Sequence, residues 1–275
     1  MAEREVGRVH GLWRYPVKSM LGEVLQQVTL TPSGICGDRA YALWDHATAR
    51  VASAKNPRLW SALLGFRARF LEQPLPDLPS PIAIEPAGAS HESPLLSTDP
   101  HRNKRLSEWL GRQVSLLDVA PEGASLDQYW PDVKEREFQD VVNELVLPKG
   151  TFFDSCPIHA ISTSTLERLR HLEPQLDFAV ERFRPNLLIR THNAGEHFPE
   201  EQWIGHTLRL GKSLKLRVND GCPRCVVTTL AQGGLPGEIE ILRATARHNK
   251  VVAGIRLSVV EPGPLMVGDV VTLLA

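Results

Sequence analysis

The sequence predicts a mainly β, α+β protein. Many short segments alternate apolar and polar residues, as strands with one buried face do. Turns rich in glycine and proline separate these segments, and only two stretches have the spacing of an amphipathic helix. Many short strands with few helices are typical of a barrel or a sandwich.

The amino-terminal part begins with two clear strand patterns. Residues 6–13 alternate, and residues 24–30 alternate again before a Thr-Pro-Ser-Gly turn. Shorter strand patterns follow on either side of a turn at residues 45–48 and further along the chain. We predict these strands at residues 41–44, 50–53 and 114–119.

A proline-rich stretch covers residues 74–100, with seven prolines. Proline removes a backbone donor and blocks a regular helix, so we expect edge strands and loops here. Residues 103–111 have helical spacing, and Gly111 is a typical residue to end such a helix.

The second half of the chain is predicted to be a separate domain. Residues 120–150 read as a loop-rich connection, and a helix is predicted at residues 164–172 from its stripe of leucines. We therefore place an amino-terminal domain at residues 1–118 and a second domain at residues 119–275. Six strands are predicted in the second domain, at residues 186–190, 207–210, 215–218, 226–230, 255–260 and 270–274.

The composition excludes several classes of function. The 275 residues include 31 Lys and Arg against 32 Asp and Glu, a balance that does not indicate nucleic-acid binding. No apolar run approaches the roughly 20 residues of a membrane helix, and the first residues lack the apolar stretch of a secretory signal. We expect a cytoplasmic protein that binds neither nucleic acid nor a membrane.

The strongest chemical motif is Asp220-Gly-Cys-Pro-Arg-Cys-Val-Val-Thr-Thr229, in which two thiols stand three positions apart. Arg224 would favour the thiolate form of Cys225 if its side chain turned toward the sulfur, and thiolates bind soft metals. Four cysteines in a chain of this length do not indicate a disulfide framework.

Three uses of this pair remain open at this point. A thioredoxin-like dithiol normally starts a helix, whereas the β-branched residues 226–229 favour a strand. A zinc site would need a second pair of ligands, which the sequence does not offer at the usual spacing. The third use is a single cysteine that ligates a metal or acts as a nucleophile. Two buried, inert thiols are the alternative without a function.

Two motifs in the amino-terminal part could bind a phosphate. Lys18 and Ser19 offer a point charge and a hydroxyl donor, and Arg39 could form two hydrogen bonds while Asp38 holds its guanidinium. Taken alone, these residues would be a solvated turn and a surface ion pair.

Two further motifs in the second half place polar side chains beside prolines. Asp154 and Ser155 precede Pro157 in a predicted turn, and Arg184 and Asn186 flank a proline and could face one pocket. An Asx turn and ordinary surface contacts are the alternatives.

Together, and in this order, the motifs resemble one family. They are Tyr15-Pro-Val-Lys-Ser19, Gly37-Asp-Arg39, Arg182-Phe-Arg-Pro-Asn186, the segment from Cys222 to Thr229, and a closing Val-Gly-Asp-x-Val. The chain is similar to the MOSC proteins with a fused N-terminal MOSC β-barrel domain, a group that includes the mitochondrial amidoxime-reducing component. The resemblance implies a MOSC β-barrel fold with a β-barrel-like domain before it.

The resemblance also implies a molybdenum cofactor, Mo-molybdopterin, and assigns residues to it. Cys225 would ligate the metal. The remaining assignments are to contacts with the pterin and its phosphate, and they fall on Lys18, Ser19, Arg39, Ser155, Arg184, Asn186 and Thr228. Asp154 would line the active site, and we regard it as a candidate for proton supply.

The sequence departs from the family pattern in two places. Relatives often continue Thr-Thr with an Asp-Pro pair, whereas Leu230-Ala-Gln232 stands here, which makes the substrate range uncertain. The four-cysteine cluster of a ferredoxin domain, which some relatives carry, is absent from the sequence. We therefore expect electrons from a separate ferredoxin-like or cytochrome b5-like protein.

The function that the resemblance implies is the reduction of small N-hydroxylated substrates such as amidoximes, hydroxylamines or N-oxides. The alternative is a carrier that delivers the cofactor, or sulfur on Cys225, to another enzyme. A thiol redox module based on Cys222 and Cys225 is a third hypothesis.

Overall fold

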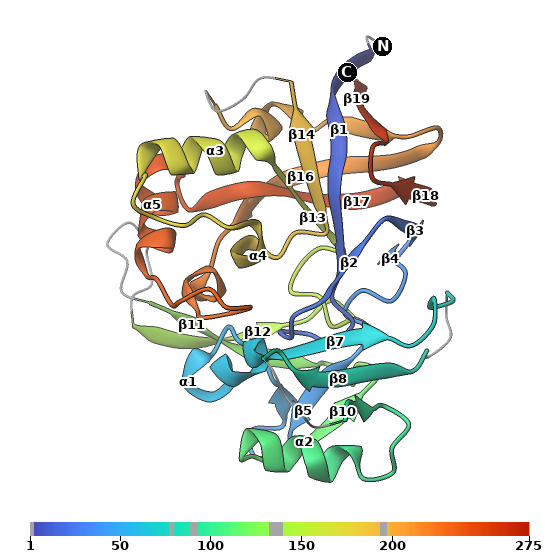
Figure 1. The fold of residues 1–275 in the computed structure, drawn as a ribbon, viewed down its shortest axis with the longest axis vertical. Helices are drawn as coiled ribbons and strands as arrows, with labels where there is room; N and C mark the ends of the chain where they lie inside the picture. Colours follow the sequence, from blue (N-terminus) through green and yellow to red (C-terminus); the bar gives the residue numbers. More distant parts are fainter. Residues whose placement is uncertain (1–2, 77–79, 89–92, 132–139, 193–196, 275) are drawn as a thin grey trace.

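The computed structural model describes residues 3–76, 80–88, 93–131, 140–192 and 197–274. Figure 1 shows an upper part built around a large sheet and a lower part of smaller sheets, with the two chain ends side by side at the top. Two stretches of the proline-rich segment, residues 77–79 and 89–92, lie outside the described residues.

A closed barrel forms the upper part. Its strands follow the order β14-β13-β17-β16-β15-β19-β1, and β14 pairs with β1 to close the circle. All neighbouring pairs are antiparallel except β13 with β14. The strands are β1 (Glu3–Arg14), β13 (Ile158–Ser162), β14 (Leu187–Thr191), β15 (Thr207–Leu210), β16 (Leu214–Pro223), β17 (Val252–Glu261) and β19 (Val270–Leu274).

These strands close around one core, and a register shift between Val9 and Gly11 brings Val9 and Leu12, three positions apart, to the same face of β1. Val9 and Leu12 on β1 point inward with Leu187 and Ile189 on β14, and all four side chains are at most 2 % exposed. The outer face of each strand meets solvent or helices, because successive side chains along a strand point to opposite faces of the sheet. The fold is therefore mainly β, with a closed barrel, as predicted.

Small sheets make up the lower part and the junction. They are β10-β5-β6, β7-β8-β9, β18-β3-β4 and the pair β11-β12, and β2 extends the barrel sheet beside β1. Their bounds are β2 (Glu23–Leu25), β3 (Gln27–Thr31), β4 (Gly34–Ile35), β5 (Ala42–Asp45), β6 (Arg50–Val51), β7 (Phe66–Phe70), β8 (Ile82–Pro86), β9 (Leu95–Leu96), β10 (Val114–Leu117), β11 (Ser125–Trp130), β12 (Val141–Val146) and β18 (Gly263–Met266).

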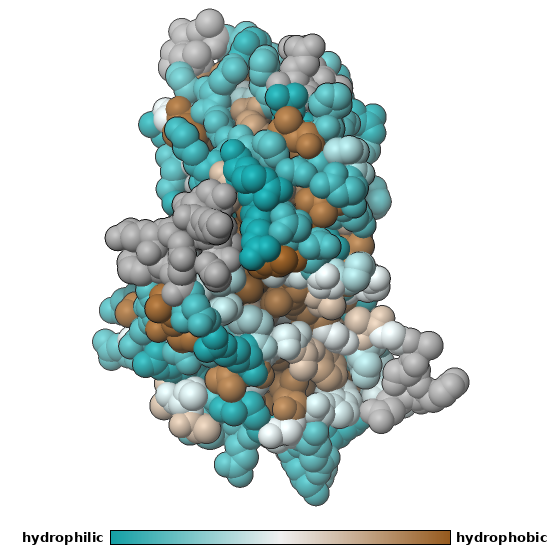
Figure 2. Space-filling model, turned by 90° about the vertical axis from the view of Figure 1, so that its left-hand side faces the viewer, coloured by the Kyte–Doolittle hydropathy of each residue, from teal (hydrophilic) through white to brown (hydrophobic). Residues whose placement is uncertain are grey.

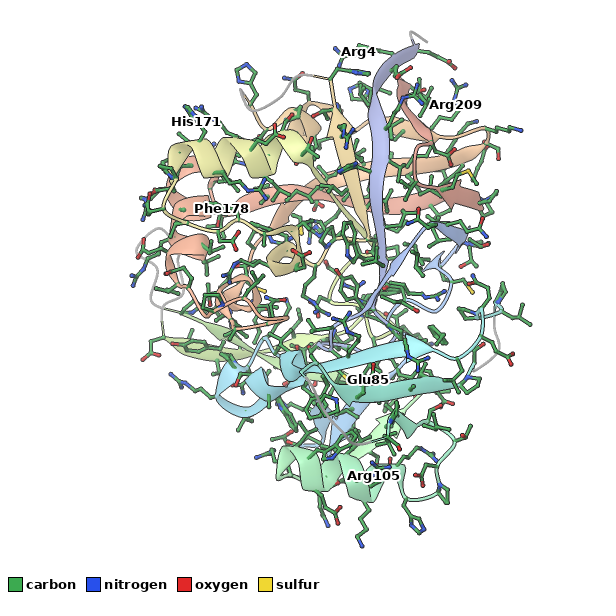
Figure 3. All side chains as sticks on the ribbon, viewed as in Figure 1. Arg4, Glu85, Arg105, His171, Phe178 and Arg209 are labelled. Carbon is green, nitrogen blue, oxygen red and sulfur yellow. The ribbon has the colours of Figure 1, made fainter. Side chains whose placement is uncertain are left out.

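Helices cover the outside of both parts. In the lower part α2 packs beside β10, and in the upper part α3 and α5 cover one side of the barrel (Figure 1). The helices are α1 (Pro57–Trp60), α2 (Arg102–Leu110), α3 (Thr163–Leu172), α4 (Val180–Phe183) and α5 (Glu240–Asn249), with 3-10 turns η1 (Ser61–Gly65), η2 (Pro199–Trp203) and η3 (Val226–Thr229). Figure 3 shows His171 on α3 pointing outward and Phe178, which is fully buried, beneath that helix.

The two predicted helices are confirmed. Helix α2 ends at Gly111, which adopts the left-handed conformation with φ of 64°. Helix α3 begins at Ser162, whose hydroxyl accepts a hydrogen bond from the Thr165 amide at 3.0 Å. The strand predicted at residues 24–30 is divided into β2 and β3, which pair with different partners.

Two local predictions are wrong. Residues 226–229 form the 3-10 turn η3 rather than a strand, and Leu230 follows it. The hydroxyls of Thr228 and Thr229 donate to the carbonyls three residues earlier and close the turns. The prediction of a loop-rich connection at residues 120–150 is wrong for residues 125–130 and 141–146, which form the hairpin of β11 and β12.

The predicted boundary at residue 118 remains a prediction. Strand β1 precedes that boundary, yet it hydrogen-bonds to β14 and β19, which follow it. After Arg14 the same chain segment enters the lower part, where Val17 pairs with Tyr41. One continuous segment therefore connects the barrel to the lower part.

Glu173 joins the two outer helices, and we predict that its contribution to stability depends on pH. It follows α3, and it accepts hydrogen bonds from Arg247 at 2.7 Å and His248 at 2.9 Å, both on α5. Hydrogen bonds from Arg247, His248 and Gln175 lower the pKa of Glu173 to about 2. Replacement by glutamine should lower the free energy of unfolding at pH 7 by about 1 kcal/mol.

The sign of the pH dependence follows from the lowered pKa. The carboxylate stabilises the folded state above the ordinary glutamate pKa, and this contribution is lost as the pH falls toward 2. Urea unfolding of wild type and Glu173→Gln at pH 7, 5 and 3 should show a difference that shrinks at the lowest pH. A difference that stays constant over this range would contradict the assignment.

Candidate functional site

A cavity of about 390 Å³ has walls from both parts of the molecule. Residues from the lower part, from the β11–β12 hairpin and from the barrel all line it. Eight of the nine site residues predicted from the sequence meet there, namely Lys18, Ser19, Arg39, Asp154, Ser155, Arg184, Asn186 and Cys225. Sequence positions more than 200 residues apart therefore share one site.

Thr228 is the predicted site residue that the structure does not bring to the cavity wall. Its side chain is 1 % exposed, and its hydroxyl donates to the carbonyl of Cys225 at 3.0 Å. Its amide donates to the same carbonyl at 3.1 Å. Thr228 therefore fixes the backbone at Cys225.

Cys225 is presented at the end of a barrel strand. Strand β16 ends at Pro223, and the Arg224 amide donates to the carbonyl of Val251 at 2.7 Å. This hydrogen bond holds the end of β16 beside the start of β17. Cys225 then precedes the 3-10 turn η3, and its thiol is free and half-buried. A half-buried thiol on a fixed backbone can reach a ligand in the cavity.

Arg224 contacts the other thiol of the motif. Its Nη1 lies 2.9 Å from Sγ of Cys222 and 3.1 Å from Nε2 of His159, and its Nη2 donates to the carbonyl of Phe183 at 2.6 Å. Burial, and then the charge of Arg224, holds the pKa of His159 well below its usual value of 6.5. The imidazole is therefore neutral at pH 7.

A carboxylate between two ammonium groups forms another wall. Lys18 Nζ donates to Asp154 Oδ1 at 2.7 Å and to the Phe152 carbonyl at 2.6 Å, while Lys55 Nζ lies 3.4 Å from Asp154 Oδ2. Burial acts to raise the pKa of Asp154, but Lys18 and Lys55 together hold it far below its ordinary value. Asp154 is thus ionised at pH 7 and poorly suited to donate a proton.

Lys18 itself is almost completely buried, with 5 % of its surface exposed. Burial lowers the pKa of Lys18 from its usual 10.5, and the contact with Asp154 opposes this effect. A buried ammonium with one carboxylate partner remains attractive to an anion in the cavity.

Two arginines share the ring of Tyr15. The guanidinium carbons of Arg39 and Arg184 each lie 4.4 Å from the centre of the ring. Burial raises the pKa of Tyr15 to about 12, so the phenol is neutral and its hydroxyl donates to the Pro185 carbonyl at 3.1 Å. The ring therefore fixes both guanidinium groups in one region of the wall.

Asp38 anchors Arg39 from behind. Its carboxylate is fully buried and pairs with Arg39, and it also accepts hydrogen bonds from the Tyr15 amide at 2.8 Å and from Asn186 Nδ2 at 3.1 Å. Burial acts to lower the pKa of Arg39, but Asp38 raises it above the usual value. Arg39 is thus a permanent cation that faces the cavity.

Arg184 has unused hydrogen-bonding capacity. Its Nη2 donates to the Met20 carbonyl at 2.7 Å, whereas its Nη1 is buried and has no hydrogen-bond partner among the described residues. Burial lowers the pKa of Arg184 to about 10. An acceptor oxygen from a ligand in the cavity would satisfy this atom.

Three cavity residues also have a strained backbone. Ser19, Arg39 and Arg184 adopt φ values of 64°, 49° and 50°, in the left-handed region that residues with a Cβ seldom occupy. Such positions cost about 1 kcal/mol or more each and cluster at functional sites. Four other described residues with a Cβ share this conformation but do not line the cavity, namely Ala49, Asp140, Lys250 and Val251, so the strain is not confined to the site.

Like the Thr228 hydroxyl, the two serine hydroxyls that were predicted to bind a ligand already have protein partners. Ser19 Oγ accepts from the Ala54 amide at 3.0 Å, and Ser155 Oγ accepts from Arg256 at 3.2 Å. Both residues still line the cavity.

The cavity wall is strongly cationic. Among the described lining residues, Asp154 is the sole carboxylate, and it faces Lys18, Arg39, Lys55, Arg184, Arg224 and Arg256. The chain as a whole has a formal net charge of -1, so this charge is concentrated locally. The cavity therefore suits an anionic ligand.

The lining residues that were not predicted as site residues include Lys55, His159 and Arg256. Arg256 stands opposite His159 and Asp220 on the neighbouring strands, and this cross-strand position cannot be read from local pattern. Lys55 belongs to no motif, although it directly precedes the Asn-Pro start of α1.

Two family models match segments of the chain. The MOSC domain model matches residues 148–272, and the MOSC N-terminal beta barrel domain model matches residues 6–72. The chain carries a MOSC domain and a MOSC N-terminal domain.

Two proteins of known name are similar to the chain at low identity. Mitochondrial amidoxime reducing component 2 of Rattus norvegicus is 26 % identical over 244 residues, which cover 82 % of this chain and 68 % of that protein. The Homo sapiens protein of the same name is 24 % identical over 245 residues, with the same coverage.

Among solved structures, the YUAD protein of Bacillus subtilis covers 99 % of this chain and 97 % of its own, with a TM-score of 0.48 and 12 % identity. YiiM of Geobacillus stearothermophilus covers 44 % of this chain and 55 % of its own, with a TM-score of 0.33 and 13 % identity.

The site is not a closed metal site made of protein ligands. Within the described ranges, no three or more His, Cys, Asp or Glu side chains come close enough together to hold a metal ion. A metal at Cys225 would thus need further ligands from a bound group. The cationic wall and the unpartnered Arg184 Nη1 fit a group that also carries phosphate and ring oxygens.

Gly254 on β17 lies close to Ala160 and His159 on β13. We predict that a residue with a Cβ cannot replace it without loss of stability. A Cβ at this position would lie 2.4 Å from the Ala160 carbonyl oxygen and 2.5 Å from His159 Nε2, and φ is +83°. Gly254→Ala should lower the free energy of unfolding by about 3 kcal/mol.

Gly150 provides the matched control for this substitution. It has φ of +72° and open space around the Cβ position, so Gly150→Ala should cost only about 1 kcal/mol from the backbone alone. Urea unfolding measures both variants. Equal losses of unfolding free energy in the two variants would contradict the prediction. The close contacts of a Cβ with Ala160 and His159 would then not explain why position 254 requires glycine.

Proposed function

We propose that this protein binds the molybdenum cofactor in the cavity, with Cys225 as the metal ligand, and reduces N-hydroxylated substrates. The observation that carries the proposal is that the free, half-buried thiol of Cys225, with those of Cys156 and Cys222, lines the same cavity as six cationic side chains. The MOSC domain and the named relatives agree with this reading.

Different residues of the chain would bind different parts of the cofactor. Lys18, Arg39 and Arg184 would hold the phosphate and ring oxygens, because they are buried or anchored cations whose positions Asp154, Asp38 and Tyr15 fix. Cys225 would hold the metal as a thiolate, which is a soft ligand. When bound, the cofactor supplies a metal centre that takes up oxygen and exchanges electrons with the substrate.

Proton supply is the second task of the protein. Removal of the oxygen of an N-hydroxyl group as water consumes two electrons and two protons. Because Asp154 is held ionised, we propose that it serves to place Lys18 and Lys55 rather than to donate these protons. The electrons would come from a separate ferredoxin-like or cytochrome b5-like protein.

We predict that Cys225→Ser loses reductase activity while Cys222→Ser retains it. Protein from cells with active cofactor synthesis would be assayed with benzamidoxime and a chemical electron donor, alongside molybdenum analysis and pterin fluorescence. Loss of the metal ligand should lower activity by about 100-fold or more, whereas the neighbouring thiol should be replaceable.

The same measurements separate the competing hypotheses. Wild type that holds molybdenum and pterin but reduces no N-hydroxylated substrate would favour the carrier. Loss of activity in Cys222→Ser with molybdenum retained would favour the dithiol module. Wild type with neither molybdenum nor pterin would contradict cofactor binding itself.

A further inference from the structure

The cavity has an apolar wall that cofactor anchoring does not use. Trp130, Leu145, Phe153 and Val227 line it, and all four side chains are half-buried, as expected for groups that face a cavity. Val227 stands two residues after Cys225, so the apolar wall extends to the thiol. A cavity lined by both cationic and apolar side chains can bind two chemically different groups.

The β11–β12 hairpin supplies two of these side chains through its register. Trp130 pairs with Val141, Gln128 with Asn143, and Leu126 with Leu145. Side chains at alternate positions share a face, so Trp130, Gln128 and Leu145 point to the same side. Each of these three residues lines the cavity.

Contacts with the lower part hold the hairpin in place. Arg50 pairs with Asp127 at 2.6 Å, and the Tyr129 amide donates to the Lys55 carbonyl at 2.8 Å. Lys55 Nζ also donates to Gln128 Oε1 at 3.1 Å. The hairpin thus presents its apolar side chains from a fixed position.

The surface agrees with this arrangement. Figure 1 shows β11 and β12 crossing between the upper and lower parts, and Figure 2 shows apolar surface at the level where the two parts meet. Apolar side chains that remain accessible beside a polar site favour an apolar ligand group over water.

We propose that Trp130 and Leu145, together with Phe153 and Val227, bind the planar aromatic or heteroaromatic body of the substrate and so determine the substrate range. This inference rests on the proposed function, because it assumes that the N-hydroxyl group of the substrate points toward Cys225. An indole is suited to this task, since it offers a large flat apolar surface at a low cost in conformational entropy. Aromatic amidoximes are thus preferred over small aliphatic ones.

Kinetics on two substrates test the preference. With cofactor-loaded enzyme and a chemical electron donor, Trp130→Ala should raise the KM for benzamidoxime about tenfold, which corresponds to about 1.4 kcal/mol of lost binding, and change kcat by less than about twofold. For acetamidoxime, which lacks the ring, kcat/KM should change by less than about twofold. Leu145→Ala should show the same pattern to a smaller degree.

Val146→Ala is the matched control. Val146 neighbours Leu145 on β12 but is 64 % exposed and does not line the cavity. This variant should behave as wild type with both substrates. Trp130→Phe keeps an aromatic ring and should retain most of the preference for benzamidoxime over acetamidoxime. It serves as a second variant if Trp130→Ala fails to fold.

A binding measurement provides a readout that does not depend on turnover. Benzamide, a neutral aromatic compound that cannot be reduced in this way, should bind wild type about tenfold more tightly than Trp130→Ala in titration calorimetry. Equal binding, or equal losses for both amidoximes, would overturn the inference. Loss of molybdenum from Trp130→Ala would also overturn it, because the wall would then hold the cofactor.

Failure of the proposed function has a different signature. If wild type turned over neither amidoxime, the reductase proposal would fail. Binding of benzamide that still depends on Trp130 and Leu145 would support the apolar wall as a ligand site in that case.

Discussion

The crowding of like charges around one cavity is the constraint on which the rest of the site depends. Six cationic side chains face a space lined by one carboxylate, Asp154, in the part of the chain that the structure describes. Burial lowers the pKa of both Lys18 and Arg184, which shows that their charged forms are costly there. These like charges can remain together only because other groups fix each cation in place. An anionic ligand in the cavity would stabilise the arrangement further.

The fold supplies the fixing groups from distant places in the chain. Strand β1 closes the barrel and then carries Tyr15 and Lys18 into the lower part, where Tyr15 contacts both Arg39 and Arg184. Asp154 precedes the barrel strand β13, while Cys225 follows β16. Closure of the barrel therefore assembles a site that neither part of the molecule contains by itself.

Sequence reasoning predicted much of this site because its residues lie in short motifs beside prolines and glycines. The strands with strong alternation and the helix ended by Gly111 were also predictable, since local pattern determines them. The hairpin of β11 and β12 was not, because its exposed valines and polar face give no clear alternation. Residues 226–230 were wrongly assigned to a strand, since threonine hydroxyls satisfied the backbone locally and outweighed β propensity. Lys55 and Arg256 depend on tertiary neighbours that no local pattern reveals.

The most direct test of the account is crystallographic. Protein prepared with active cofactor synthesis would be crystallised, and diffraction would be recorded at the molybdenum absorption edge. The account predicts an anomalous peak within bonding distance of Cys225 Sγ and a phosphate in contact with Lys18, Arg39 or Arg184. A molybdenum peak remote from Cys225, or a phosphate held by other residues, would contradict it.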